Sequence, residues 1–190
     1  MVVLSVTSRL VAIAIAGFVL SAAGAHPASG MGSASLLAPV SACPGSNRAQ
    51  TDPGVEITAM ACLVDYARAQ ANRAPLHETA ILDRVASLKV AAIVRCGVLT
   101  HNPCGEPLQA AFAAGGYPLD GGYSIGENLA YGQQTLGSPR GIMRGWLGSI
   151  DHRTNLLSAG WKTFGVGVRS QVTFEGNSQI AVWVGEFGTR

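Results

Sequence analysis

Hydrophobic residues recur every three to four positions through the first half of the chain, which is the spacing of one face of a helix. The first stripe lies within residues 56–72 and consists of Ile57, Met60, Leu63, Val64 and Ala67. The second lies within residues 78–97 and consists of Ile81, Val85, Leu88 and Ala92, with Gly97 as a C-terminal stop. Both segments are predicted to be amphipathic helices. Two shorter helices are predicted, one from Pro107 to Ala114 and one over residues 139–148.

The last quarter of the chain changes to the residue types of β-strands. Residues 163–172 and 179–188 are rich in β-branched and aromatic side chains, and the turn-like EGNS at residues 175–178 separates them. These segments are predicted to form an antiparallel hairpin. Helices followed by strand pairing, instead of strict alternation, indicate an α+β layered domain and not a parallel βαβ fold.

The N-terminus has the pattern of a secretory signal over residues 1–25. It combines one early cation at Arg9, an apolar run over residues 10–20 and small residues at the end. The alternative is a membrane anchor, but the run is shorter than the roughly 20 residues that cross a bilayer. A secreted mature chain without a transmembrane helix is therefore expected. Residues 26–53 are predicted to be a flexible lead-in, and a single domain is expected over residues 54–190.

The chain contains four cysteines, and all of them follow the expected cleavage site. An even number in an exported chain indicates two disulfides, for which three pairings exist. Proximity in sequence favours Cys43 with Cys62 and Cys96 with Cys104. A zinc site made of four thiolates is the weaker alternative, because no CxxC spacing occurs.

Charge gives little information about a ligand. Only 13% of the residues are charged and the formal net charge is +2, so no basic run indicates a nucleic-acid partner. The HExxH and GxSxG signatures of hydrolases are absent from the sequence. Cysteine nucleophile chemistry is also disfavoured if all four thiols are oxidised.

Three polar residues are candidates for a functional site. His101 in LTHNPC and His152 in SIDHRTN lie in polar contexts, and Glu127 lies between glycines in GYSIGENLAYG. Two histidines and a carboxylate are the ligand types of a zinc or other divalent metal site. The alternative for Glu127 is a buried carboxylate that accepts histidine or backbone hydrogen bonds. In both cases the glycines are expected to let the backbone turn tightly around Glu127.

Five segments, in their order along the chain, resemble the CAP superfamily of cysteine-rich secretory, antigen 5 and pathogenesis-related proteins. The segments are THNPCG, GYSIGENLAYG, GWLGSIDHRTNLL, WKTFGVGV and AVWVGEFG. The resemblance covers residues 56–188. Within the superfamily, the chain looks like a bacterial secreted member with an SCP-like domain. It implies a three-layer α-β-α sandwich with a small antiparallel sheet and a cleft that carries two histidines and acidic residues.

The same resemblance assigns the candidate residues to that cleft. By motif position, His101 matches the first family histidine, Glu127 the GEN glutamate and His152 the second histidine. Asn128 is a candidate for orienting the cleft. Where many members have a second glutamate, three residues after the helix tryptophan, this chain has Ser149, and Asp151 is the only nearby acid that could substitute for it.

These features predict a secreted, non-enzymatic binding module whose His/Glu cleft takes a divalent metal and whose grooves take a lipid, a sterol-like molecule or a peptide. The first alternative is a metal-assisted hydrolase of peptides, in which Glu127 acts as base and the histidines hold metal and water. The second alternative is an extracellular structural scaffold whose loops contact another protein.

Overall fold

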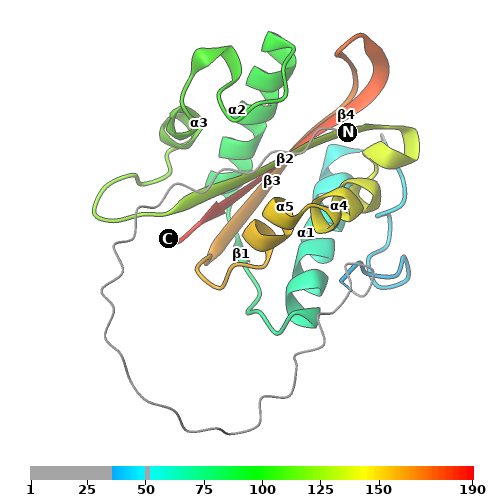
Figure 1. Ribbon diagram of the computed structural model, residues 1–190, viewed down its shortest axis with the longest axis horizontal. Coiled ribbons are helices and arrows are strands. Elements are labelled where there is room, and N and C mark those ends of the chain that lie inside the picture. Colours follow the sequence, from blue (N-terminus) through cyan, green and yellow to red (C-terminus); the bar gives the residue numbers. More distant parts are fainter. Residues whose placement is uncertain (1–35, 50–51) are drawn as a thin grey trace, which may run out of the picture.

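The computed structural model describes residues 36–49 and 52–190, arranged as three layers with a sheet in the middle. The expected signal segment, residues 1–25, lies outside the described residues. Figure 1 shows α2 and α3 on one side of the sheet and α1, α4 and α5 on the other. The three-layer α+β sandwich implied by the family resemblance is therefore confirmed.

Four of the helices, α1 to α4, begin and end close to the predicted positions, and α5 and two 3-10 helices were not predicted. The helices are α1 (Pro53–Gln70), α2 (Ala80–Cys96), α3 (Leu108–Gly115), α4 (Pro139–Gly148) and α5 (Ile150–Leu156), with short 3-10 helices η1 (Pro103–Gly105) and η2 (Gln134–Gly137). Side-chain caps fix several starts: Asp52 accepts from the backbone N–H of Gly54, and Thr79 accepts from that of Leu82. Helix α2 ends at Gly97, whose φ of 68° is left-handed, as the C-terminal stop predicts.

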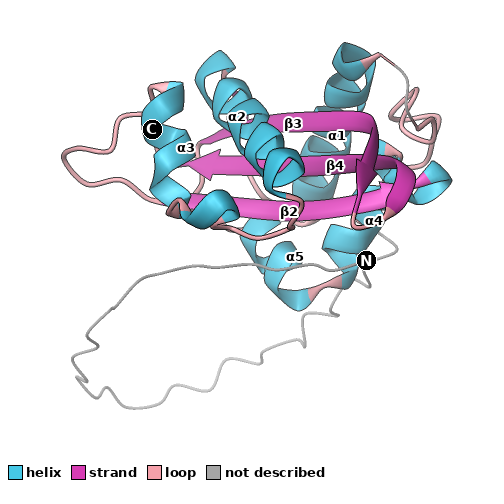
Figure 2. Ribbon diagram, turned by 90° about the horizontal axis from the view of Figure 1, so that it is seen from above, coloured by secondary structure: helices cyan, strands magenta, loops and turns pink. Residues whose placement is uncertain are grey.

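The sheet has the strand order β1-β3-β4-β2, and Figure 2 shows β4 between β3 and β2. The strands are β1 (His77–Glu78), β2 (Ile125–Gln133), β3 (Thr163–Phe174) and β4 (Asn177–Gly188). Strands β3 and β4 form the predicted antiparallel hairpin, and β2 pairs antiparallel with β4 along its whole length. The two-residue β1 runs parallel to β3. The sheet is therefore mixed at this one edge, where the sequence indicated only antiparallel pairing.

The side chains of β4 alternate between two separate hydrophobic clusters. Trp183 and Phe187 pack in the cluster with α1 and α4, whereas Val182 and Val184 pack in the cluster with α2. This period of two is the ordinary consequence of the pleated backbone. Each side chain on these strands therefore lies on one of the two faces of the sheet, and the two faces pack in separate clusters.

Helix α2 lies very close to the sheet because β3 presents glycines beneath it. A Cβ at Gly165 would lie 2.2 Å from the backbone carbon of Leu82, and a Cβ at Gly167 would lie 2.6 Å from that of Ala86. This approach turns Leu82 and Ala86 onto the buried face of α2. The predicted stripe is therefore partly wrong, because its members Ile81 and Leu88 are exposed.

The disulfides join Cys43 with Cys62 and Cys96 with Cys104, which confirms the favoured pairing. The first of them attaches residues 36–49 to α1. Leu36, Ala38 and Cys43 are buried in the core cluster that contains α1 and α4, and the carbonyl of Ser46 accepts a hydrogen bond from the backbone N–H of Arg140. Within the expected flexible lead-in, these residues are therefore packed as part of the domain.

Within GYSIGENLAYG, residues 125–132 belong to the extended strand β2, so the predicted tight turn around Glu127 is wrong. Gly126 has no left-handed φ, and its role is to allow close approach. A Cβ there would lie 2.7 Å from the Trp161 ring and 2.8 Å from Oδ1 of Asn155. Strand β2 lies at the free edge of the sheet, where the Trp146 indole N–H donates to the Leu129 carbonyl at 3.3 Å.

Among the described residues, no helix has the length and apolar character needed to cross a membrane.

The close contact between α2 and β3 leads to a stability prediction. Gly165→Ala should lower the free energy of unfolding by about 1–3 kcal/mol, because the new methyl group would overlap the backbone of α2. Chemical denaturation monitored by circular dichroism would measure this change. Gly148→Ala is the matched control: a Cβ at Gly148 meets nothing within 4 Å, so it should leave stability unchanged or raise it. Equal effects of the two substitutions would contradict the packing argument.

Candidate functional site beneath helix α2

Glu127 and Asn128 are consecutive residues of β2, so their side chains point to opposite faces of the sheet. The neighbours of Glu127 lie on the side covered by α2, whereas those of Asn128 lie on the side covered by α5. The GEN motif therefore contributes to two polar networks instead of one.

On the α2 side, the Glu127 carboxylate is fully buried and paired with two groups of the same chain. His101 Nδ1 lies 2.6 Å from Oε1 of Glu127, and Lys89 Nζ lies 3.4 Å from Oε2. The Lys89 ammonium also donates to the His101 carbonyl at 2.8 Å. A carboxylate can only accept, so His101 must carry its proton on Nδ1 when Glu127 is ionised. The three residues form a closed triangle of contacts.

Glu186 brings a second carboxyl group to the same side. It is the direct cross-strand partner of Glu127 in the β2–β4 register and is fully buried. Burial is the largest cause that raises the pKa of Glu186 well above its ordinary value of 4.5, and the charge of Glu127 and a hydrogen bond to Glu127 raise it further. Neither oxygen of Glu186 accepts a hydrogen bond from an N–H or hydroxyl group of residues 36–49 and 52–190. Burial and the neighbouring Glu127 carboxylate therefore both favour the protonated form of Glu186.

Lys89 and Glu186 were not among the residues predicted from the sequence. For Lys89 a signal existed, because it lies four residues from both Val85 and Ile93, which are buried on the same face of α2. For Glu186 the signal was a lone carboxylate inside the hydrophobic strand AVWVGEFG. Charged side chains are almost never fully buried unless they are paired. A buried Lys89 and a buried Glu186 are therefore each expected to have a polar partner nearby.

On the opposite side, Asn128 connects β2 to α5 and to the loop that follows. Its amide donates to the His152 carbonyl at 3.1 Å, and its Oδ1 accepts from the Asn155 amide at 2.9 Å. The Trp161 indole N–H completes this chain of contacts, because it lies 2.8 Å from the Asn155 carbonyl and 3.1 Å from its Oδ1. Asn128 and Asn155 therefore fix the position of α5 against the sheet.

The structure brings two of the predicted site residues, His101 and Glu127, together. His101 and Glu127 are in direct contact, whereas His152 meets β2 through its backbone carbonyl on the other side. Ser149 is half-buried between α4 and α5, and Asp151 is exposed on the first turn of α5. Neither of them is placed to provide the second acid beside Glu127. The carboxyl group paired across the strands with Glu127 is that of Glu186 on β4.

The donors in this arrangement do not fit one divalent ion held by His101, Glu127 and His152. A metal beside Glu127 would meet the Lys89 ammonium, which already supplies a positive charge 3.4 Å from Oε2. In the described part of the chain, no group of three or more His, Cys, Asp or Glu side chains is arranged to hold a metal. Ligation by these three residues stays a prediction from sequence.

The fold and the sequence together define the class of protein. The family model for the cysteine-rich secretory protein family, CAP, matches residues 63–187, which is most of the chain. The chain therefore belongs to the CAP family. The matched region contains the whole of the Lys89, His101, Glu127 and Glu186 cluster.

Solved structures of bacterial proteins share this fold at low sequence identity. An extracellular protein containing an SCP domain from Bacillus anthracis strain Ames is 20% identical with a TM-score of 0.59, over 71% of this chain and 40% of that one. A cysteine-rich secretory protein from Staphylococcus aureus Mu50 is 13% identical with a TM-score of 0.57, over 74% of this chain and 40% of that one.

An outer surface protein from Borrelia burgdorferi is 19% identical with a TM-score of 0.55, over 69% of this chain and 90% of that one. The chain thus spans less than half of the Bacillus and Staphylococcus proteins, so these similarities concern the fold alone. No curated protein sequence matches the chain.

The buried ion pair leads to a double-mutant prediction. Lys89→Met should lower the free energy of unfolding by about 3–5 kcal/mol, because it leaves the buried Glu127 carboxylate without its cation. Adding Glu127→Gln to that variant should recover much of the loss, since the uncompensated charge is then removed. Urea denaturation at neutral pH would measure both effects. Lys162→Met is the control, because Lys162 is exposed and should change stability by less than about 0.5 kcal/mol. If the double mutant were less stable than Lys89→Met alone, the pairing of Lys89 with Glu127 would be contradicted.

The raised pKa of Glu186 leads to a pH prediction. The folded protein holds this proton more tightly than the unfolded chain, so the stability it provides is fully present below about pH 4.5 and is lost as pH rises through the raised pKa. Glu186→Gln cannot ionise. As pH rises above 4.5, the variant should gain stability relative to wild type by up to about 1.4 kcal/mol per pH unit. Thermal denaturation of both proteins from pH 4 to 9 would test this, and parallel curves would refute it.

Proposed function

We propose that this chain is a secreted CAP-domain binding module without catalytic activity of its own. One observation carries the proposal: the buried Glu127 carboxylate has Nδ1 of His101 2.6 Å from Oε1, and the Lys89 ammonium forms an ion pair with it at 3.4 Å from Oε2. The cluster is closed on itself, and its ion pairs stabilise the face on which α2 packs. Binding would then take place at the surface of a domain that this cluster keeps rigid.

The hydrolase alternative receives less support from the same geometry. A general base needs an oxygen or nitrogen within hydrogen-bond reach of the proton that it removes. Glu127 has no exposed atom, and Nε2 of His101 is buried with no hydrogen-bond partner among the described residues. A substrate would reach either group only after the segment carrying His101 had moved.

Secretion is the second part of the proposal. Two disulfides are typical of a compartment outside the reducing cytosol. The Bacillus protein is described as extracellular, the Borrelia protein as an outer surface protein and the Staphylococcus protein as secretory. The signal pattern of residues 1–25 agrees with export. The ligand classes to test are those expected from the family resemblance, namely fatty acids, sterols and peptides.

A comparison of wild type with Glu127→Gln tests the absence of catalysis. Both proteins are incubated with a peptide library and with ester substrates, with and without added Zn²⁺, and cleavage is followed by mass spectrometry. We expect the same background cleavage from both, because Glu127 has a stabilising role. Binding of radiolabelled fatty acid, sterol and peptide pools is measured on the same samples, and it should be retained by every variant that stays folded.

Asn72→Gln serves as the control, because Asn72 is an exposed amide that lies outside the cluster, beyond the end of α1. Cleavage by wild type that Asn72→Gln preserves and Glu127→Gln abolishes would overturn the proposal and favour the hydrolase. Circular dichroism of each variant separates such a result from simple unfolding.

A further inference from the structure

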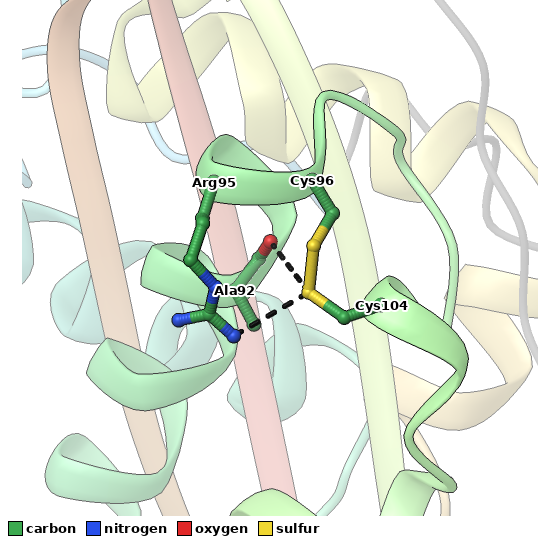
Figure 3. The surroundings of a disulfide bond; sticks show 4 residues. All are labelled: Ala92, Arg95, Cys96 and Cys104. Atoms are coloured by element: carbon green, nitrogen blue, oxygen red, sulfur yellow. Dashed lines mark hydrogen bonds between the residues drawn. A yellow bond between two sulfur atoms is a disulfide. The ribbon is translucent and has the colours of Figure 1, made fainter.

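The Cys96–Cys104 disulfide closes the loop that carries His101. Cys96 is the last residue of α2, and Cys104 lies in η1, so His101 belongs to the seven residues between them. Both cysteines are exposed. Figure 3 shows the bond at the end of α2, with the Arg95 side chain and the Ala92 carbonyl on the side of Cys104.

The inner side of this loop is held by the buried cluster. His101 reaches Glu127 at 2.6 Å, Lys89 donates to the His101 carbonyl at 2.8 Å, and Leu99 is buried in the hydrophobic cluster beneath α2. The loop is therefore fastened at two places, by a covalent bond at the surface and by polar contacts inside. A change in the covalent bond acts directly on the segment that positions His101.

The two sulfur atoms lie in different electrostatic surroundings. Nη2 of Arg95 lies 3.4 Å from Sγ of Cys104, and a guanidinium at this distance stabilises a thiolate. The C-terminus of α2 places partial negative charge near both sulfur atoms, since Cys96 is its last residue and the Ala92 carbonyl lies 3.7 Å from Sγ of Cys104. Among the described residues, however, the guanidinium contact is made to Cys104 and not to Cys96. Cys104 is thus the better leaving group in thiol–disulfide exchange, and an incoming thiolate should attack Cys96.

A small pocket lies beside the disulfide, between α2 and α3. Its volume is about 120 Å³. Its walls are formed mainly by alanine and proline side chains, together with the cations Lys89 and Arg95 and the acid Glu106. An engineered cavity of about 150 Å³ holds benzene, so this pocket has room for a few non-hydrogen atoms. Of its two cations, only Arg95 is exposed, and it lies next to the sulfur of Cys104.

We propose that Cys96–Cys104 is a thiol-exchange site that takes a small anionic thiol and controls the position of His101. The thiolate attacks Sγ of Cys96, the Cys96–Cys104 bond breaks, and Cys104 leaves as a thiolate beside Arg95. The product is a mixed disulfide at Cys96. A second thiolate then attacks the outer sulfur of that mixed disulfide, which frees Cys96 and releases the oxidised form of the small thiol. Opening the bond frees one end of the loop, so His101 becomes accessible to solvent.

The test uses the full chain with mercaptoacetate, a small anionic thiol, and cysteamine, a cationic thiol of similar size. The rate of opening and the site of the adduct are followed by mass spectrometry of acid-quenched samples. At equal thiolate concentration, mercaptoacetate should react roughly fivefold faster than cysteamine because of the exposed cation. Arg95→Gln should remove that preference, and its adduct should be divided between Cys96 and Cys104.

The other disulfide, Cys43–Cys62, serves as an internal control. Cys43 is buried in the core cluster, so the Cys43–Cys62 disulfide should open at least about tenfold more slowly than Cys96–Cys104. Equal opening rates, or a wild-type adduct mainly on Cys104, would overturn the proposal. Equal rates with the two thiols in wild type would overturn the part that concerns the anionic ligand.

Accessibility of His101 provides a separate readout. After the freed thiols are capped, histidines are labelled with diethylpyrocarbonate and located by mass spectrometry. His77 is exposed and should be labelled in both states, whereas His101 is 7% exposed and should be labelled only after Cys96–Cys104 has opened. Persistent protection of His101 after opening would show that the disulfide does not control the loop, and the proposal would fail. This readout is independent of whether the protein is a catalyst.

Discussion

The buried carboxylate of Glu127 is the constraint on which this side of the domain depends. An ionised group without solvent access needs nearby positive charge and hydrogen-bond donors. The chain meets this need from two separate elements, with Lys89 from α2 and His101 from the following loop, and the raised pKa of Glu186 on β4 disfavours a second negative charge beside it. Helix α2, the His101 loop and the two strands are therefore held in one relative position by the same negative charge.

Local patterns in the sequence predict most of the architecture. Four of the helices, the C-terminal hairpin and both cysteine pairings agree with the structure, because each depends on spacing over a short stretch of chain. Strand β2 was not predicted from the sequence, because its glycines suggested a turn. These glycines serve close packing in an extended strand, and only the position of Trp161 and Asn155 in space reveals this.

The composition of the site could be predicted only in part. Motif position correctly brought His101 to Glu127, but it also assigned His152 to the same cleft. Strand alternation places the His152 backbone carbonyl beside Asn128, on the opposite side of the sheet from the Glu127 carboxylate, and this becomes evident only once β2 is known to be a strand. Lys89 and Glu186 come from elements that no local motif connects. Their pairing depends on the β2–β4 register and on the close approach of α2 to β3.

The indole of Trp146 has a consequence for the solubility of the domain. Strand β2 is the last strand of the sheet, and a free edge of this kind can pair with a strand from another molecule. The Trp146 N–H already occupies the Leu129 carbonyl near the middle of that edge. A neighbouring strand would have to displace a buried aromatic ring before it could continue the sheet. The tryptophan of α4 thus protects the domain against edge-to-edge aggregation as well as filling its core.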